Sequence, residues 1–183
     1  MNTPILETER LILRPLSVAD ANDIYERWCT DERVAKYVRW FVHSSVDVTI
    51  QWLEAEEKNI PSDKVYQWGF TRKEDGYLFG SGGIHYNEEE DAWELGYNLM
   101  HSFWNQGYAT EAAKAMLDFG INKLGVKEFI AWHAVENPAS GAVMRKCGFV
   151  YEKNEVHTKF DGVTAFDTKK HRLVVNEELE KCK

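Results

Sequence analysis

The sequence predicts an α+β domain built around a mixed, mostly antiparallel sheet of about seven strands, flanked by about four helices. Three observations point to this class: segments with the two-residue alternation of strands, segments with apolar residues at helical spacing, and an order that intersperses the two kinds. Short turns join several neighbouring strand segments, as in antiparallel hairpins. The 183 residues are enough for one domain with a sizeable core and few for two, so we expect residues 1–183 to form a single domain.

One strand and two helices are expected in the first third of the chain. The alternation in ERLILRPLS predicts the strand, and apolar residues near helical spacing after Ser17 predict the first helix. The second helix carries Val46, Ile50 and Leu53 on one stripe, and a serine before it supplies the cap. These elements span residues 9–17, 18–29 and 44–59.

Three strands joined by the turns EDG and NEEED follow, and after them helices and strands alternate. A long helix has a buried stripe through Ala112, Met116 and Phe119, and a short helix has Pro138 in its first turn and Gly148 at its end. A hairpin with Asp-Gly in its turn closes the sheet. In order, these elements span residues 64–73, 77–86, 92–100, 107–124, 127–135, 137–148, 149–160 and 163–175.

Charge and cysteine content narrow the class of function. A formal net charge of -8 argues against general binding of nucleic acid, which needs a basic face, and the acidic runs, among them NEELEK (176–181), are expected to be solvated. Cys29, Cys147 and Cys182 lie far apart without a CxxC pair, so we expect reduced thiols rather than disulfides or a zinc site. The chain shows no signal peptide and no stretch near the roughly 18 apolar residues of a membrane span. We therefore expect a cytoplasmic protein that binds neither nucleic acid nor membranes.

The start of the helix at 107–124 raises a question of hydrogen bonding. The first N–H groups of a helix lack intrahelical partners, and a polar side chain usually accepts from them. Asn105 offers such a side chain, which would make this an ordinary capped helix. Gly107 favours another interpretation, because a residue without Cβ lets an anion approach several converging N–H groups at the positive end of the helix dipole. The segment therefore predicts an anion site, with the capped helix as the alternative.

Several motifs together resemble one family. WNQGYATEA (104–112) is preceded by ELGYNL (94–99) and followed by NPAS (137–140) and RKCGF (145–149), and the opening LETERLILRPLSVADANDIYE fits the same pattern. In this order and spacing they resemble the GNAT acyltransferases, in particular the RimJ/RimL branch of ribosomal-protein N-acetyltransferases, over about residues 5–175. The resemblance implies the GNAT fold, in which the fourth strand splays from the fifth to leave a cofactor cleft.

The resemblance also implies acetyl-CoA as co-substrate. Amides at the helix start would hold its pyrophosphate, and the end of the fourth strand would pair with pantetheine and polarise the thioester carbonyl. Asn137 would reach the pantetheine arm, although it also suits a cap before Pro138. The family has Arg or Gln where this chain has Trp104, a departure usual for this branch. No cluster has metal-ligand spacing, so no metal is expected. The residues assigned to the co-substrate are Asn98, Leu99, Met100, Gln106, Gly107, Tyr108, Ala109, Thr110, Asn137 and Ser140.

Two residues are candidates for the chemistry. Many GNAT enzymes carry a tyrosine acid where this chain has Met144, which cannot donate a proton. The resemblance to the ribosomal-protein branch gives that role to Ser140, as an acid or a hydrogen-bond partner of the sulfur, with a first-turn helix serine as the alternative. Glu94 is the expected base, directly or through water, because a carboxylate on a central strand among apolar neighbours favours a cleft and a raised pKa. The alternative is a structural glutamate that binds a loop.

The acceptor site is placed by the resemblance around YVRWFVH (37–43). Tyr37, Trp40 and Phe41 are expected to shape a pocket together with His85, and simple packing of a loop is the alternative. We expect direct transfer of acetyl to a primary amine, and the resemblance favours a protein or peptide N-terminus, possibly ribosomal, as the acceptor. A small amine (polyamine, amino acid or aminoglycoside) is an alternative, as is a CoA-binding module without turnover. The chain is expected to be a monomer or a homodimer.

Overall fold

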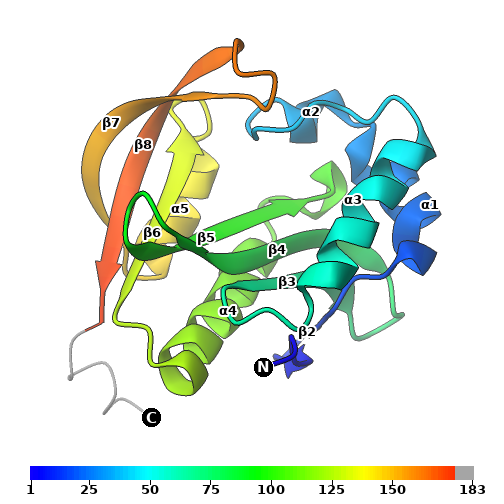
Figure 1. Cartoon of the computed structure of the whole chain (residues 1–183), viewed down its shortest axis with the longest axis horizontal. Coiled ribbons are helices and arrows are strands. Elements are labelled where there is room, and N and C mark those ends of the chain that lie inside the picture. The colour runs from blue at the N-terminus through cyan, green and yellow to red at the C-terminus, as the bar shows by residue number, and fades with distance from the viewer. Residues whose placement is uncertain (176–183) are drawn as a thin grey trace.

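Eight strands form one sheet in the order β1-β2-β3-β4-β5-β6-β8-β7 in the computed structural model, which describes residues 1–175 (Figure 1). Among the described strands, β5 and β6 are parallel and all other neighbouring pairs are antiparallel. The predicted α+β class with a mixed, mostly antiparallel sheet is therefore confirmed. The strands are β1 (Leu6–Glu7), β2 (Leu11–Arg14), β3 (Val65–Arg72), β4 (Leu78–Asn87), β5 (Ala92–Leu99), β6 (Glu128–Ala134), β7 (Val150–Thr158) and β8 (Ala165–Val174). The helices are α1 (Ala21–Ile24), α2 (Glu32–Ala35), α3 (Val46–Asn59), α4 (Tyr108–Leu124) and α5 (Pro138–Lys146).

Three elements in the first part of the chain differ from the prediction. The two-residue strand β1 pairs with β2 and brings the sheet to eight strands. The predicted helix at 18–29 consists of a 3₁₀ turn, α1 and the π-helical turn Tyr25–Cys29. The short helix α2 falls in a segment to which no element was assigned, and the side chain of Asp31 caps it by accepting from the Arg33 N–H at 2.9 Å. The NEELEK run and Cys182 lie outside the described residues.

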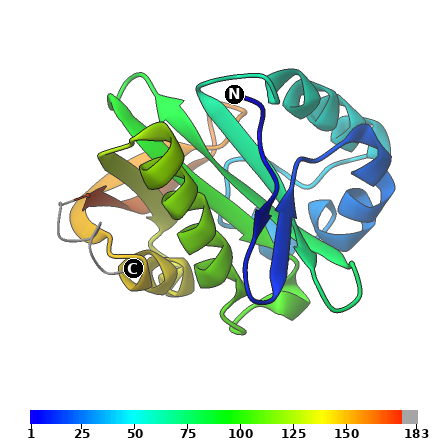
Figure 2. The same ribbon diagram turned by 90° about the horizontal axis from the view of Figure 1, so that it is seen from below.

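Helices cover both faces of the sheet, α4 and α5 on one face and α1 and α3 on the other (Figure 2). A separate hydrophobic cluster lies under each pair of helices. On the first face Ala112, Met116 and Phe119 are buried, as predicted from their helical spacing. Gly120 lets α4 approach β6 closely, because a Cβ at that position would lie 2.7 Å from the ring of Phe129. Each large apolar side chain buried in these layers contributes about 1.5–3 kcal/mol. The central strands are therefore held from both sides, which gives the cleft beside them a rigid frame.

β5 and β6 separate soon after they meet. They pair only at Trp93↔Phe129 and Glu94↔Ile130, whereas β6 pairs with β8 along its whole length, from Glu128↔Val174 to Ala134↔Thr168. The two ribbons diverge in Figure 1. The predicted splay between the strands at 92–100 and 127–135 is thus confirmed, and it leaves the second half of β5 without a partner on that side. No helix within residues 1–175 is long and apolar enough to cross a membrane.

Candidate active site

A cavity of about 540 Å³ fills the gap between the diverging strands. We call the part bounded by the starts of α4 and α5 the helix end, with lining residues Gly107, Tyr108, Ala109, Thr110, Asn137 and Ser140. We call the part beneath the β7–β8 hairpin the hairpin end, with lining residues Tyr37, Arg39, Glu94, Trp132, His157 and Phe166. Most of the predicted site residues therefore meet at one cavity.

The first turn of α4 has no side-chain cap. Its N-cap is Gly107, in the left-handed conformation at φ 83°, and Asn105 makes no cap hydrogen bond although its φ is also positive, at 59°. The alternative of an Asn105-capped helix is therefore wrong. Gly107 to Thr110 line the cavity and no side chain caps their N–H groups, which is the arrangement of an anion site. Gln106 does not line the cavity. Its side-chain amide nitrogen donates to the Ser102 carbonyl at 2.7 Å.

The end of β5 reaches the cavity through Asn98 and Leu99 but not through Met100. The Met100 N–H donates to the Phe79 carbonyl at 2.7 Å, so this group is already bonded within the sheet. The Leu99 carbonyl accepts from the indole nitrogen of Trp104 at 2.8 Å and keeps its second lone pair. The residue that departs from the family pattern thus fixes the end of β5.

Asn137 lines the cavity at the N-cap of α5. Its side-chain oxygen accepts from the Ser140 N–H at 3.3 Å, so the cap role considered for it is present. The cap uses the oxygen of the side chain, and the amide nitrogen is a separate donor. Capping of α5 and contact with a ligand are therefore compatible.

Ser140 is paired with Tyr97, a residue that was not among the predicted site residues. The Tyr97 hydroxyl lies 3.0 Å from Ser140 Oγ and donates to the Ser140 carbonyl at 3.1 Å. Burial raises the pKa of Tyr97 above its usual range, against the effect of the hydrogen bond to Ser140. The phenol therefore stays protonated at neutral pH. The sequence feature that could have indicated this role is the position of Tyr97 within the ELGYNL motif.

Glu94 lines the cavity, but its pKa is lowered, so the expectation of a raised pKa is wrong. Burial acts to raise the pKa, and the hydrogen bond and charge of His85 together with the hydrogen bond from Asn87 outweigh it. The pairing of β4 with β5 puts His85 directly opposite Glu94, with Nε2 at 3.1 Å from Oε2, and Asn87 donates to the same oxygen at 3.0 Å. The carboxylate is therefore ionised at neutral pH. His85 itself lies behind Glu94 and does not line the cavity.

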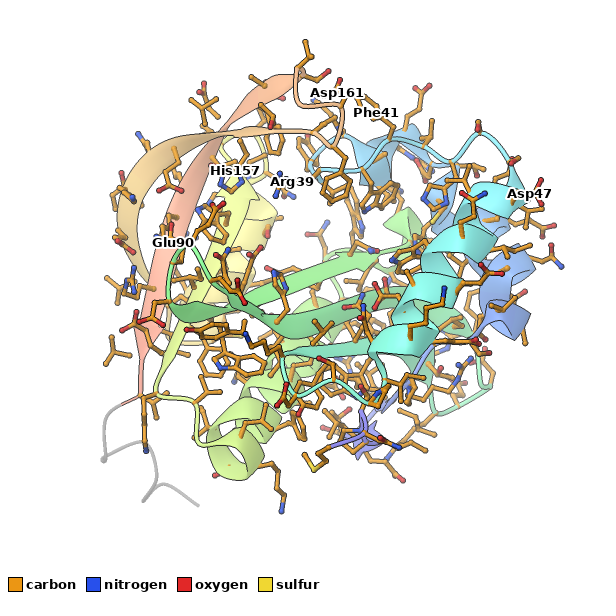
Figure 3. All side chains as sticks on the ribbon, in the orientation of Figure 1. Arg39, Phe41, Asp47, Glu90, His157 and Asp161 are labelled. Atoms are coloured by element: carbon orange, nitrogen blue, oxygen red, sulfur yellow. The ribbon has the colours of Figure 1, made fainter. Side chains whose placement is uncertain are left out.

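The hairpin end receives Tyr37 but not Trp40 or Phe41 of the predicted aromatic pocket. Trp40 packs against the hydrophobic cluster under α1 and α3, and Phe41 is 46% exposed. In their place the structure brings Arg39, Trp132, His157 and Phe166 to this end of the cavity. Figure 3 shows Arg39 and His157 on facing sides of the space between the hairpin and the segment after α2.

Lys159 joins the two segments that cover the hairpin end. Its ammonium donates to the carbonyls of Ala35, Val38 and Trp40 at 2.7, 2.8 and 3.2 Å. The Phe160 N–H adds a bond to the Arg39 carbonyl at 2.9 Å. The tip of the β7–β8 hairpin is therefore fastened to the segment that carries Tyr37 and Arg39.

His133 also lines the cavity, with Nδ1 bonded and Nε2 buried without a hydrogen-bond partner among the described residues. His133 is buried, its Nδ1 lies 2.8 Å from the Ala134 carbonyl, and its ring lies 5.1 Å from that of His171. Burial lowers the pKa of His133, so the ring is neutral at neutral pH. Within residues 1–175 no group of three or more His, Cys, Asp or Glu side chains is placed to hold a metal ion.

Comparison with known proteins identifies the kind of site. Residues 10–150 match the acetyltransferase (GNAT) domain family. The chain is 28% identical over 172 residues to the uncharacterized N-acetyltransferase YoaA of Bacillus subtilis, over 93% of this chain and 97% of that protein. It is also similar to two solved structures. Their sequence identity to this chain is low, so they support the fold and not the substrate. A GNAT-family acetyltransferase from Bacillus anthracis has a TM-score of 0.79 at 24% identity, over 93% of this chain and 98% of that one. An acetyl transferase from Salmonella typhimurium that modifies the N-terminal serine of ribosomal protein L7/L12 has a TM-score of 0.81 at 15% identity, over 94% and 100%.

Proposed function

The chain belongs to the GNAT family and is an acetyl-CoA-dependent N-acetyltransferase, and we propose that its acceptor is the free N-terminal amine of a polypeptide. The observation that carries this choice is the ionised Glu94 at the hairpin end, held at a lowered pKa by His85 and Asn87 despite its burial. The structural relative that modifies an N-terminal serine is consistent with the same acceptor class.

The proton balance favours an α-amine over a lysine. An N-terminal ammonium has a pKa of about 8, whereas that of a lysine is about 10.4. The two pKa values differ by about 2.4 units. Transfer of the proton from the ammonium to Glu94, whose pKa is lowered, is therefore about 3.3 kcal/mol less favourable for the lysine, or about 250-fold in the equilibrium constant. Glu94 is thus a weak base that suits an amine already partly neutral at pH 7. Its charge also attracts the incoming ammonium.

The helix end suits the phosphates and pantetheine of acetyl-CoA. Uncapped N–H groups, a left-handed Gly107 without Cβ, and a second half of β5 without a partner on the β6 side leave the donors and the space that such a ligand needs. We assign the pyrophosphate to the amides of Gly107 to Thr110 and the pantetheine to the end of β5 and to Asn137. When bound, acetyl-CoA would supply a thioester whose carbonyl carbon is open to attack by the amine and whose sulfur leaves as a thiolate.

Ser140 and Tyr97 act together at the leaving sulfur. Tyr97 donates to the Ser140 carbonyl, which orients the first turn of α5 and leaves the Ser140 hydroxyl to donate to the sulfur. A thiolate with a pKa of about 8.5 is a weaker base than a phenolate whose pKa is raised. The pair therefore stabilises the thiolate by hydrogen bonding and does not transfer a proton to it. A backbone N–H at the end of β5 is the donor to the carbonyl oxygen as negative charge develops there.

The test is thiol release from acetyl-CoA with matched amines. One peptide is offered with a free N-terminus and again with a blocked N-terminus and an internal lysine, and a polyamine and an aminoglycoside complete the panel. We expect release with the free N-terminus at least 50-fold faster than with the blocked lysine peptide, below the 250-fold limit set by amine pKa alone. Turnover confined to the lysine peptide or the small amines would overturn the assignment of the acceptor.

A further inference from the structure

Arg10 lies beside the first turn of α4, although about a hundred residues of chain separate them. Its Nη1 donates to the Gln106 carbonyl at 3.1 Å, and its guanidinium lies over the ring of Tyr108 at 4.2 Å. A Cβ at Gly107 would lie 3.4 Å from Arg10 Nη2. One side chain therefore contacts the residues on both sides of Gly107, at the turn whose residues Gly107 to Thr110 line the cavity.

The same guanidinium engages Glu111, one turn into α4. Nε and Nη2 of Arg10 both contact Glu111 Oε2 at 2.7 Å. The other carboxylate oxygen accepts from the Thr8 hydroxyl at 2.6 Å and from the Arg10 N–H at 2.8 Å. The hydrogen bonds of Thr8 and Arg10 keep the pKa of Glu111 lowered, against the effect of its burial. The negative charge of Glu111 is thus fixed and neutralised next to the proposed anion site.

We propose that Arg10 is a positioning residue for the pyrophosphate of the acetyl donor. It holds the Gln106–Gly107 turn so that the following N–H groups face the cavity. It also cancels the charge of Glu111, which would otherwise repel a phosphate at the first turn of the helix. The contact of Nη1 with a carbonyl and the contacts of Nε and Nη2 with one carboxylate oxygen use the fork of donors that lysine lacks. This inference rests on the proposed binding of CoA at the helix end.

The first experiment compares binding of CoA with binding of pantetheine, which lacks the phosphates, by calorimetry. Arg10→Met is expected to weaken CoA at least tenfold and pantetheine less than twofold, and Arg10→Lys to recover part of the loss. Arg14→Met is the matched control, since Arg14 makes a similar pair with Asp20 on the same segment and does not line the cavity. It should lower the melting temperature without changing either affinity. Equal weakening of both ligands by Arg10→Met, or no change for CoA, would overturn the proposal.

A second variant separates charge from scaffolding. In Arg10→Met the carboxylate of Glu111 is left without its cation, so adding Glu111→Gln should recover CoA affinity at least threefold. A purely structural role for Arg10 predicts no recovery, and that result would refute the neutralisation of Glu111. If the native protein binds neither CoA nor pantetheine, the proposed function falls together with this inference. Tight CoA binding that is insensitive to Arg10 refutes this inference alone.

Discussion

The helix end and the hairpin end of the cavity are built in different ways. The helix end is made chiefly of consecutive backbone groups, from Gly107 to Thr110, at the start of one helix. The hairpin end is assembled from side chains of separate segments, among them Arg39, Glu94 and His157. Backbone groups of one turn keep their geometry when distant side chains change, whereas an assembled wall depends on several strand registers at once. Affinity for the acetyl donor and choice of acceptor can therefore change independently of each other.

The largest effect is expected at the helix end. Gly107→Glu places a Cβ and a negative charge at a residue with φ 83°, among the N–H groups proposed for the pyrophosphate, and should weaken CoA at least about 100-fold. Gly76→Glu is the control, because Gly76 has φ 71° in a turn and nothing within 4 Å of its Cβ position. Both variants should lose about 1 kcal/mol of unfolding free energy. Affinity for CoA is measured by calorimetry. Unchanged affinity in Gly107→Glu would show that the N–H groups at the helix end do not bind the pyrophosphate.

The same contrast explains what the sequence predicted. The helix end could be predicted because its groups belong to one short motif, in which a glycine replaces the usual cap. At the hairpin end Tyr37 and Glu94 could be predicted, but the side chains contributed by the β7–β8 hairpin could not, because β7 has an irregular register with β8 between Tyr151 and Lys153. A one-residue shift exchanges the faces of a strand, so alternation alone does not tell which side chains of that hairpin point into the cavity. His157 was missed for this reason.

The pKa of Glu94 shows a similar limit. Its burial could be predicted from one strand, and burial alone would raise the pKa. The residue that lowers the pKa against this effect of burial is His85, which faces Glu94 because of the register of the β4–β5 pairing. A single strand carries no information about its cross-strand partner. The fold class, by contrast, depends on the order of elements, and that order was correct apart from β1, α2 and the subdivision of 18–29.

At the hairpin end, Glu94→Gln should lower kcat/KM for a free-N-terminal peptide about 30-fold at pH 7 and leave CoA affinity unchanged. The pKa of Glu94 is lowered from 4.5, so its contribution is complete above that pH and is lost only as the pH falls through the lowered pKa. The ratio of wild-type to variant rates should therefore stay constant between pH 7 and 5. A ratio that already shrinks between pH 7 and 6 would show that the carboxylate titrates higher than its partners imply.

Ser140, at the helix end, and its partner Tyr97 should affect chemistry rather than either binding step. Ser140→Ala removes the proposed donor to the sulfur and should lower kcat about tenfold, the effect of one hydrogen bond to a charged group. Tyr97→Phe keeps the ring packing and should lower kcat about threefold, through poorer orientation of Ser140. The KM values for acetyl-CoA and for the peptide should change less than twofold in both. A loss of CoA affinity equal to the loss of kcat would assign Ser140 to binding instead.

A smaller effect than that of Glu94→Gln or Ser140→Ala is expected at Lys159, where the comparison is sharpest because the residue does not line the cavity. Lys159→Met keeps the length of the side chain and removes the donor to the carbonyls of Ala35, Val38 and Trp40. The segment that carries Tyr37 and Arg39 then loses these three hydrogen bonds to the hairpin and keeps the one from the Phe160 N–H to the Arg39 carbonyl. The peptide KM should rise about fivefold, a loss comparable to about 1 kcal/mol of hydrogen bonding, with the KM for acetyl-CoA unchanged. Lys64→Met, at a surface pair with Glu88, should change neither KM. An unchanged peptide KM in Lys159→Met would mean that the hairpin end holds its shape without this lysine, and equal rises in both KM values would show that the two ends are coupled.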